Sequence, residues 1–141
     1  MLTSTYSYTT TEVTKEQIWR LMSDVNRWKE WDQTVEDSHL EDDFKAGSYF
    51  TLKPVKAPRV KIRLAEVQAL QYFKDETKFP LATMTGEHWY EQTPSGLKIT
   101  VTMTMTGLLS WLWNKLVMHD IVAHLPDDVA GQIAAAQKIN T

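Results

Sequence analysis

Two side chains that could carry out chemistry, His88 and Tyr90, lie two positions apart in a segment whose residue types are typical of a β-strand. Alternate residues of a strand share one face, so both side chains are expected on the same, concave face of a sheet. There they could orient a carbonyl or hydroxyl group, or act as general acid and base. Alternatively, both are hydrogen-bonded polar groups of the core or its rim. Glu87 and Glu91 are expected on the opposite face, so spacing alone assigns no orienting carboxylate.

The sequence offers little for thiol, metal or nucleotide chemistry. It has no cysteine, which excludes thiolate metal sites, thiol nucleophiles and redox motifs. The acidic run at 41–43 lacks the spaced ligands of a calcium loop and is expected to be a solvated turn. Phosphate-binding, zinc-protease and nucleophile-elbow motifs do not occur, so we expect no metal and no cofactor. The histidines lack the short paired spacing of a metal-binding helix: His39, His88, His119 and His124.

Composition and charge narrow the class of protein further. The chain has 141 residues, of which 43% are hydrophobic and 23% charged, which is typical of one globular domain covering residues 1–141. The net charge is −3 without a basic block, which argues against nucleic-acid binding. Residues 1–13 have no signal-peptide pattern, and no apolar run approaches the roughly 18 residues of a membrane span. We therefore expect a cytoplasmic protein without a membrane span.

The elements that must position these side chains can be read from periodicity. Residues 3–13 have a strand composition, and Thr14 with Gln17 has the spacing of a capping box at a helix start. A short helical turn over 26–32 places Trp28 and Trp31 on one side. Alternating segments between turn residues then predict strands near 34–40, 48–54, 59–68, 71–78, 83–93 and 96–106.

The last predicted hairpin has the most specific pairing. If its turn is Pro94–Ser95, the two numbers of every cross-strand pair sum to 189. His88 then faces Val101 and Tyr90 faces Ile99, on the apolar face of the last strand. On this basis we expect residues 84, 88, 90, 99, 101, 103 and 105 to point inward, and Lys98, Thr100, Thr102 and Thr104 to point outward.

Residues 108–139 are expected to form one long helix that is kinked at Pro126. At 100° per residue, one face carries Trp111, Met118, Val122, Leu125, Val129, Ile133 and Ala136. The other face carries Leu109, Trp113, Leu116 and Val117 before the kink. Because this first half is apolar all round, it could cap a cavity, although Trp113 could instead be an exposed aromatic at a dimer or partner contact.

This order of elements resembles the helix-grip fold of the START/Bet v 1-like (SRPBCC) superfamily, in which a sheet wraps around a C-terminal helix. Asp24, Trp28 and Trp31 are similar to its Asp-x-x-x-Trp-x-x-Trp turn, within the segment VTKEQIWRLMSDVNRWKEW at 13–31. The segments KAGSYFTL at 45–52 and EQTPSGLKIT at 91–100 are similar to its third strand and late hairpin. The most similar subgroup is the polyketide cyclase/dehydrase-like proteins. The resemblance implies an α+β fold with a seven-stranded antiparallel sheet and two short helices after the first strand.

The resemblance also implies a cavity between the sheet and the C-terminal helix. We expect the protein to bind or transport a small hydrophobic ligand in this cavity, such as a lipid, polyketide or isoprenoid-like molecule. Two alternatives stay open: a polyketide cyclase/aromatase-like enzyme using His88 and Tyr90, or a protein-interaction module of the same fold. A homodimer is also compatible with the sequence. The residues expected to contact the ligand are Trp28, Trp31, Phe50, Met84, His88, Tyr90, Val101, Met103, Met105, Trp111, Met118 and Val122.

Overall fold

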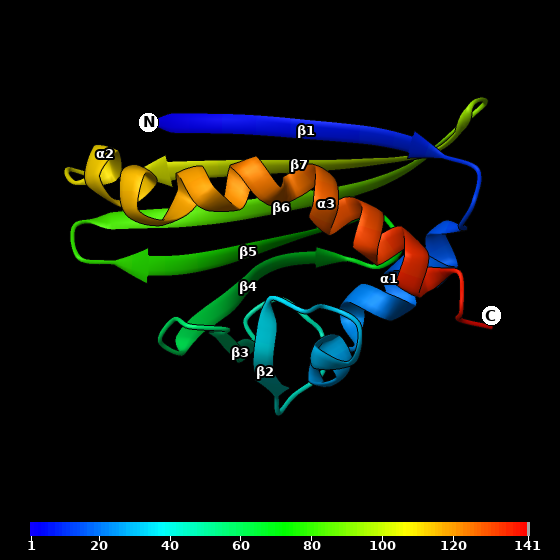
Figure 1. Cartoon of the computed structure of the whole chain (residues 1–141), viewed down its shortest axis with the longest axis horizontal. Helices are drawn as coiled ribbons and strands as arrows, with labels where there is room; N and C mark the ends of the chain where they lie inside the picture. Colours follow the sequence, from blue (N-terminus) through cyan, green and yellow to red (C-terminus); the bar gives the residue numbers. More distant parts are fainter. Residues whose placement is uncertain (141) are drawn as a thin grey trace.

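The computed structural model describes residues 1–140, and its main element is one seven-stranded antiparallel sheet (Figure 1). The strands follow the order β1-β7-β6-β5-β4-β3-β2, so the first strand lies beside the last and β2 forms the opposite edge. The predicted fold class is confirmed. The strands are β1 (Leu2–Thr10), β2 (Val35–Leu40), β3 (Tyr49–Pro54), β4 (Val60–Gln68), β5 (Tyr72–Phe79), β6 (Ala82–Thr93) and β7 (Gly96–Thr106).

The helical segments cover one face of this sheet. Figure 1 shows the C-terminal helical segment running across the sheet toward α1, which lies beside the end of the chain. The segments are α1 (Lys15–Ser23), the 3₁₀-helix η1 (Val25–Glu30), α2 (Ser110–Trp113), the π-helical turn η2 (Asn114–Met118) and α3 (His119–Ala136). No helix within residues 1–140 combines the length and the apolar character needed to cross a bilayer.

Two local predictions at the start of the chain have different outcomes. The capping box is present: the Thr14 hydroxyl accepts from the backbone N–H of Gln17, and the Gln17 side chain accepts from the N–H of Thr14. The first strand is shorter than predicted and ends at Thr10. The hydroxyl of Thr10 accepts a hydrogen bond from the N–H of Glu12, and this contact turns the chain toward α1.

The hairpin of β6 and β7 has the predicted pairing. Thr93 pairs with Gly96, His88 with Val101 and Tyr90 with Ile99. The outward threonines of β7 then meet hydroxyl groups of β1, with Thr5 and Thr102 oxygens 2.9 Å apart and Ser7 and Thr100 oxygens 3.0 Å apart. The opposite face of β7 is buried at Val101, Met103 and Met105, as expected for a sheet with one wet face.

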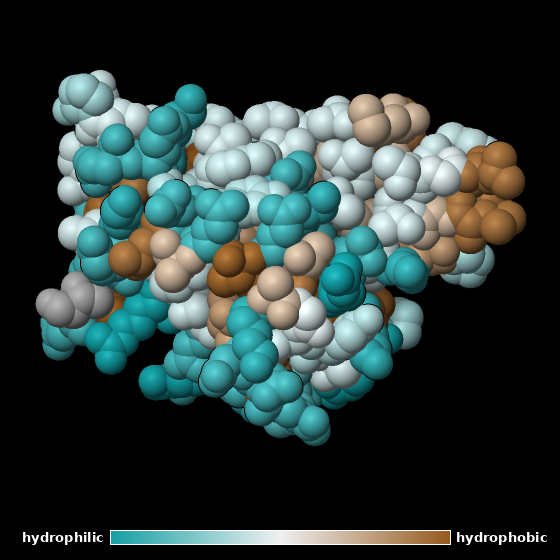
Figure 2. Space-filling model, turned by 180° about the vertical axis from the view of Figure 1, so that it is seen from behind, coloured by the Kyte–Doolittle hydropathy of each residue, from teal (hydrophilic) through white to brown (hydrophobic). Residues whose placement is uncertain are grey.

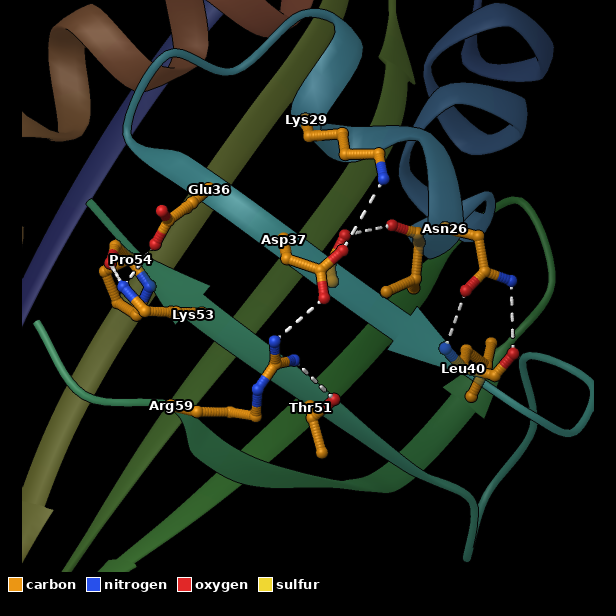
Figure 3. A network of polar contacts seen from close by, with 11 residues as sticks. Asn26, Lys29, Glu36, Asp37, Leu40, Thr51, Lys53, Pro54 and Arg59 are labelled. Carbon is orange, nitrogen blue, oxygen red and sulfur yellow. Dashed lines mark hydrogen bonds and ion pairs between the residues drawn. The ribbon is translucent and has the colours of Figure 1, made fainter.

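The edge strand β2 is held by η1 (Figure 3). The side-chain amide of Asn26 donates to the carbonyl of Leu40 at 3.1 Å and accepts from its N–H at 2.8 Å, so it takes the place of a neighbouring strand. Asp37, also on β2, accepts a hydrogen bond from Arg59 at 2.9 Å and lies 3.6 Å from Lys29. These contacts hold η1 against β2 and β3, and they therefore fix the position of Trp28, the tryptophan of η1.

The C-terminal helical segment contains a feature that the sequence did not predict. Pro126 lies inside α3 as predicted, without a backbone N–H to donate a helical hydrogen bond, and the helix continues on both sides of it. The unpredicted departure from α-helical hydrogen bonding is the π-helical turn η2 at Asn114–Met118. A π turn closes i→i+5 hydrogen bonds and so holds more residues per turn than an α-helix, which changes the faces of all residues before it.

Candidate functional site

A cavity of about 450 Å³ lies between the inner face of the sheet, η1 and the C-terminal helical segment. This volume is within the range of small-molecule sites, roughly 300–1,000 Å³. Most of the lining is apolar, and aromatic rings come from every side of the cavity. The aromatic lining residues are Trp28, Trp31, Phe50, Phe73, Phe79 and Trp113.

The helical side of the cavity is a line of residues at intervals of four. It runs from the end of α2 through η2 into α3 and consists of Trp113, Val117, Ile121, Leu125 and Val129. In a regular α-helix such a line drifts around the axis, because four residues exceed one turn. The wide π turn offsets part of this drift, since four residues fall short of one of its turns. The prediction that Trp113 and Val117 lie opposite Leu125 and Val129 is therefore wrong.

Trp113 closes one end of the cavity. Its ring stacks on Phe79 with centroids 4.8 Å apart, and its indole N–H donates to the carbonyl of Pro80 at 2.9 Å. These contacts attach α2 to the turn between β5 and β6. The alternative prediction, that Trp113 is an exposed aromatic available to a partner, does not fit, because the ring is half-buried against Phe79.

The polar group on the sheet side is the pair of His88 and Asp75. The Nε2 of His88 lies 3.0 Å from Oδ2 of Asp75, and both side chains line the cavity. The imidazole stacks on the Phe73 ring, with centroids 4.1 Å apart. Gly86 pairs with Asp75 across the strands, and a Cβ at position 86 would lie 2.9 Å from the carboxylate. The pair therefore fits only because residue 86 has no side chain.

Within residues 1–140, the Nδ1 of His88 is the only buried side-chain nitrogen or oxygen that lacks a hydrogen-bond partner. A buried N–H without an acceptor costs free energy, so a proton on Nε2, donated to Asp75, fits this site better than a proton on Nδ1. Asp75 thus supplies the orienting carboxylate that spacing did not reveal. The signal in the sequence is the shared face of Phe73, Asp75 and Thr77, with a glycine opposite the carboxylate.

A second polar group lies where the loop after η1 meets α3. Asp32, Asp128 and Gln132 all line the cavity there. The Oδ1 atom of Asp32 accepts from the backbone N–H and the hydroxyl of Thr34, at 2.9 and 2.7 Å. Burial, and then the charge of Asp32, raise the pKa of Asp128 to about 6. Asp128 thus loses its proton about two pH units higher than an ordinary aspartic acid.

The residues predicted to contact a ligand divide into two groups. Seven line the cavity: Trp28, Trp31, Phe50, Met84, His88, Val101 and Met103. The other five are outside this lining: Tyr90, Met105, Trp111, Met118 and Val122.

The five residues outside the lining have separate physical reasons. Tyr90 is buried beside Trp19 of α1, with ring centroids 6.1 Å apart, and burial raises the pKa of its hydroxyl. Met105 and Met118 are fully buried in the core, and Val122 is half-buried on α3. Trp111 points outward and is 62% exposed. The predicted acid–base pair of His88 and Tyr90 is therefore not brought together in the cavity.

Exposed apolar side chains gather at the end of the molecule that carries α2 (Figure 2). They come from the turn between β5 and β6 and from the start of the C-terminal helical segment. They are Leu81, Leu108, Trp111 and Leu116, each at least 60% exposed. As for metal sites, residues 1–140 contain no group of three or more metal-ligating side chains placed to hold an ion.

The comparisons with known proteins agree with this geometry. Residues 1–132 match a protein family described as polyketide cyclase / dehydrase and lipid transport. The chain belongs to this family. The predicted resemblance to the START/Bet v 1-like superfamily and its polyketide cyclase-like subgroup is thereby confirmed. No curated protein matches the chain.

Solved structures show the fold of this polyketide cyclase family member at low sequence identity. A hypothetical protein from Helicobacter pylori is 10% identical with a TM-score of 0.76, and the match covers 96% of this chain and 88% of that one. Ara h 8.0201 is 13% identical with a TM-score of 0.69, covering 96% of both chains. The di-domain ARO/CYC StfQ from the steffimycin biosynthetic pathway is 13% identical with a TM-score of 0.73, covering 96% of this chain and 49% of that one.

Proposed function

We propose that this chain binds a small, largely apolar molecule in the cavity between the sheet and the C-terminal helical segment. The observation that carries the proposal is the 450 Å³ cavity, in which aromatic and aliphatic side chains make up most of the lining. Burial of apolar ligand surface contributes about 25 cal/mol per Å² in such a site. The two polar groups, His88 with Asp75 and Asp32 with Asp128, would fix the orientation of the ligand.

The description of the matching family is compatible with this proposal. The description of the matching family includes lipid transport as well as cyclase and dehydrase chemistry. A lipid, a polyketide and an isoprenoid all present the apolar surface that the lining favours. The ligand would be carried within the fold, because the cavity is covered by α3 on one side and by the sheet on the other.

The experiment is to measure binding of 1-dodecanol and farnesol by tryptophan fluorescence, because Trp28, Trp31 and Trp113 line the cavity. Val117→Phe places extra volume in the cavity and should weaken binding at least tenfold. Leu116→Phe is the matched control, since residue 116 is 60% exposed and outside the lining. The proposal is wrong if no apolar probe changes the fluorescence, or if the two variants weaken binding equally.

A second candidate function is proton transfer to or from a bound carbonyl compound. The observation that favours it is the 3.0 Å contact between Asp75 and His88, because a carboxylate that orients an imidazole is a common acid–base arrangement. Turnover of an enolisable poly-β-ketone would be followed in wild type, His88→Gln and Asp75→Asn. Loss of an acid–base group should lower the rate on the order of 10²–10⁴-fold with little change in affinity. Equal rates in all three proteins would exclude this function.

A further inference from the structure

The charged residues of the cavity lining are all of one sign. Three carboxylates line it, from Asp32, Asp75 and Asp128, whereas no lysine or arginine does. Asp75 has a hydrogen-bond partner in His88, whereas no histidine, lysine or arginine of the lining is paired with Asp32 or Asp128. An anionic headgroup placed beside these two would be repelled, and a cationic one would be attracted.

The surroundings of Asp32 and Asp128 also favour a cation. Trp31 precedes Asp32 in the chain, and both Trp28 and Trp31 line the same cavity. Aromatic faces beside carboxylates attract an ammonium group through the ring quadrupole as well as through charge. The Oδ1 atom of Asp32 is engaged by Thr34, which leaves its second oxygen for another donor.

An amide side chain next to these carboxylates lines the cavity and can bind a polar group of a ligand. Gln132 lies four residues after Asp128 on α3, is only 9% exposed and lines the cavity. No hydrogen bond of its side-chain amide is found among residues 1–140, and its polar atoms, unlike Nδ1 of His88, are not fully buried. A polar side chain that lines a cavity in this way can take a ligand as its hydrogen-bond partner. The amide oxygen of Gln132 can accept a hydrogen bond from the same ammonium group that the two carboxylates attract.

We propose that the molecule bound in this cavity is an apolar amine, whose protonated amino group lies between Asp32, Asp128 and Gln132 while its apolar part fills the aromatic cavity. This inference rests on the proposed binding function and names its ligand class. It excludes fatty acids and other apolar carboxylates as preferred ligands. The titratable groups that face Asp128 are Asp32 from the loop after η1 and Asp127 and His124 from α3.

The test compares three probes with one apolar chain: dodecylammonium, 1-dodecanol and dodecanoate, each below its aggregation concentration at pH 7.5. Dodecylammonium should bind wild type at least about tenfold more tightly than dodecanoate, because a hydrogen bond to a charged group is worth about one tenfold step or more. Asp128→Asn and Asp32→Asn should each weaken dodecylammonium binding about tenfold and leave 1-dodecanol within about twofold.

The matched control is Asp127→Asn, which removes the same charge from the neighbouring, exposed position of α3. It should bind all three probes as wild type does. The inference is overturned if dodecanoate binds as tightly as dodecylammonium, or if Asp127→Asn lowers ammonium binding as much as Asp128→Asn. In both cases binding of 1-dodecanol would still support the cavity as a binding site. Failure of all three probes would instead overturn the binding function itself.

Discussion

The carboxylate of Asp75 occupies the space that a side chain on Gly86 would need. The two residues pair directly across β5 and β6, and an ideal Cβ at position 86 would lie 2.9 and 3.0 Å from the two carboxylate oxygens. Contacts this short force one group to move. The absence of a side chain at position 86 therefore keeps Asp75 within 3.0 Å of His88.

We expect Gly86→Ala to destabilise the wild-type fold by about 1–3 kcal/mol, the usual cost of overpacking a buried site. The same substitution should be neutral or stabilising in an Asp75→Ala background, because alanine costs less chain entropy than glycine once the carboxylate is gone. Urea unfolding of the two single variants and the double variant measures this coupling. Additive free energies would contradict the direct contact between residues 75 and 86.

Asp128→Asn is expected to stabilise the protein at pH 7.5. The folded-state pKa of Asp128 is raised to about 6 from an ordinary value near 4, first by burial and then by Asp32. The folded state therefore binds this proton more tightly than the unfolded state, and stability falls as the pH rises from about 4 to 6. Because Asp128 is partly exposed, the gain above pH 6 should be on the order of 1 kcal/mol. Thermal unfolding from pH 4 to 8 should show the gain disappear at low pH, with Asp127→Asn unchanged throughout.

The amide of Asn26 is expected to stabilise the edge of the sheet. Asn26→Ala removes both hydrogen bonds to Leu40 and should lower the free energy of unfolding by about 1–2 kcal/mol. Asn26→Asp keeps the acceptor for the N–H of Leu40 but cannot donate to its carbonyl, so it should restore only part of the loss. Hydrogen exchange at the N–H of Leu40 reports the effect locally. Unchanged protection in Asn26→Ala would rule out this anchoring role.

Trp113 is expected to stabilise the structure through its ring more than through its N–H. Trp113→Phe can keep the stacking on Phe79 and loses only the hydrogen bond to Pro80, so it should cost less than about 1 kcal/mol. Trp113→Ala removes the ring that closes the cavity and should cost about 2 kcal/mol or more, since the ring is half-buried. Chemical denaturation distinguishes the two, and equal losses would show that the hydrogen bond dominates.

Sequence patterns predict the late part of the sheet residue by residue. In the hairpin of β6 and β7, a two-residue turn fixes the pairing and strict alternation fixes the faces. His88 therefore pairs with Val101, as predicted from residue numbers that sum to 189 in each pair. The same logic could place Asp75 opposite Gly86 if the turn at Pro80 and Leu81 is assigned. Pro80 indicates a turn over 79–81, but Leu81 has φ 57°, a conformation that leucine rarely adopts, so the residue types do not show which two residues form the turn.

The helical side of the cavity could not be predicted in the same way. Periodicity at 100° per residue assumes an uninterrupted α-helix, and no residue type marks a π turn in Asn114–Met118. This periodicity therefore predicts Trp111, Met118 and Val122 on the cavity face, whereas Trp113 and Val117 occupy it. Asp32 and Asp128 are far apart in the chain, and only the packing of α3 against the loop after η1 brings their charges together.

The π turn at Asn114–Met118 also affects how this chain should be aligned with its relatives. Because such a turn accommodates one residue more than an α-helical turn, it is equivalent to a single-residue insertion in the helix. A relative with a regular helix here should align correctly only with a one-residue gap inside this segment. An ungapped alignment would match either Trp113 or Leu125 to a residue on a different face, and would misassign specificity positions on one side of the gap.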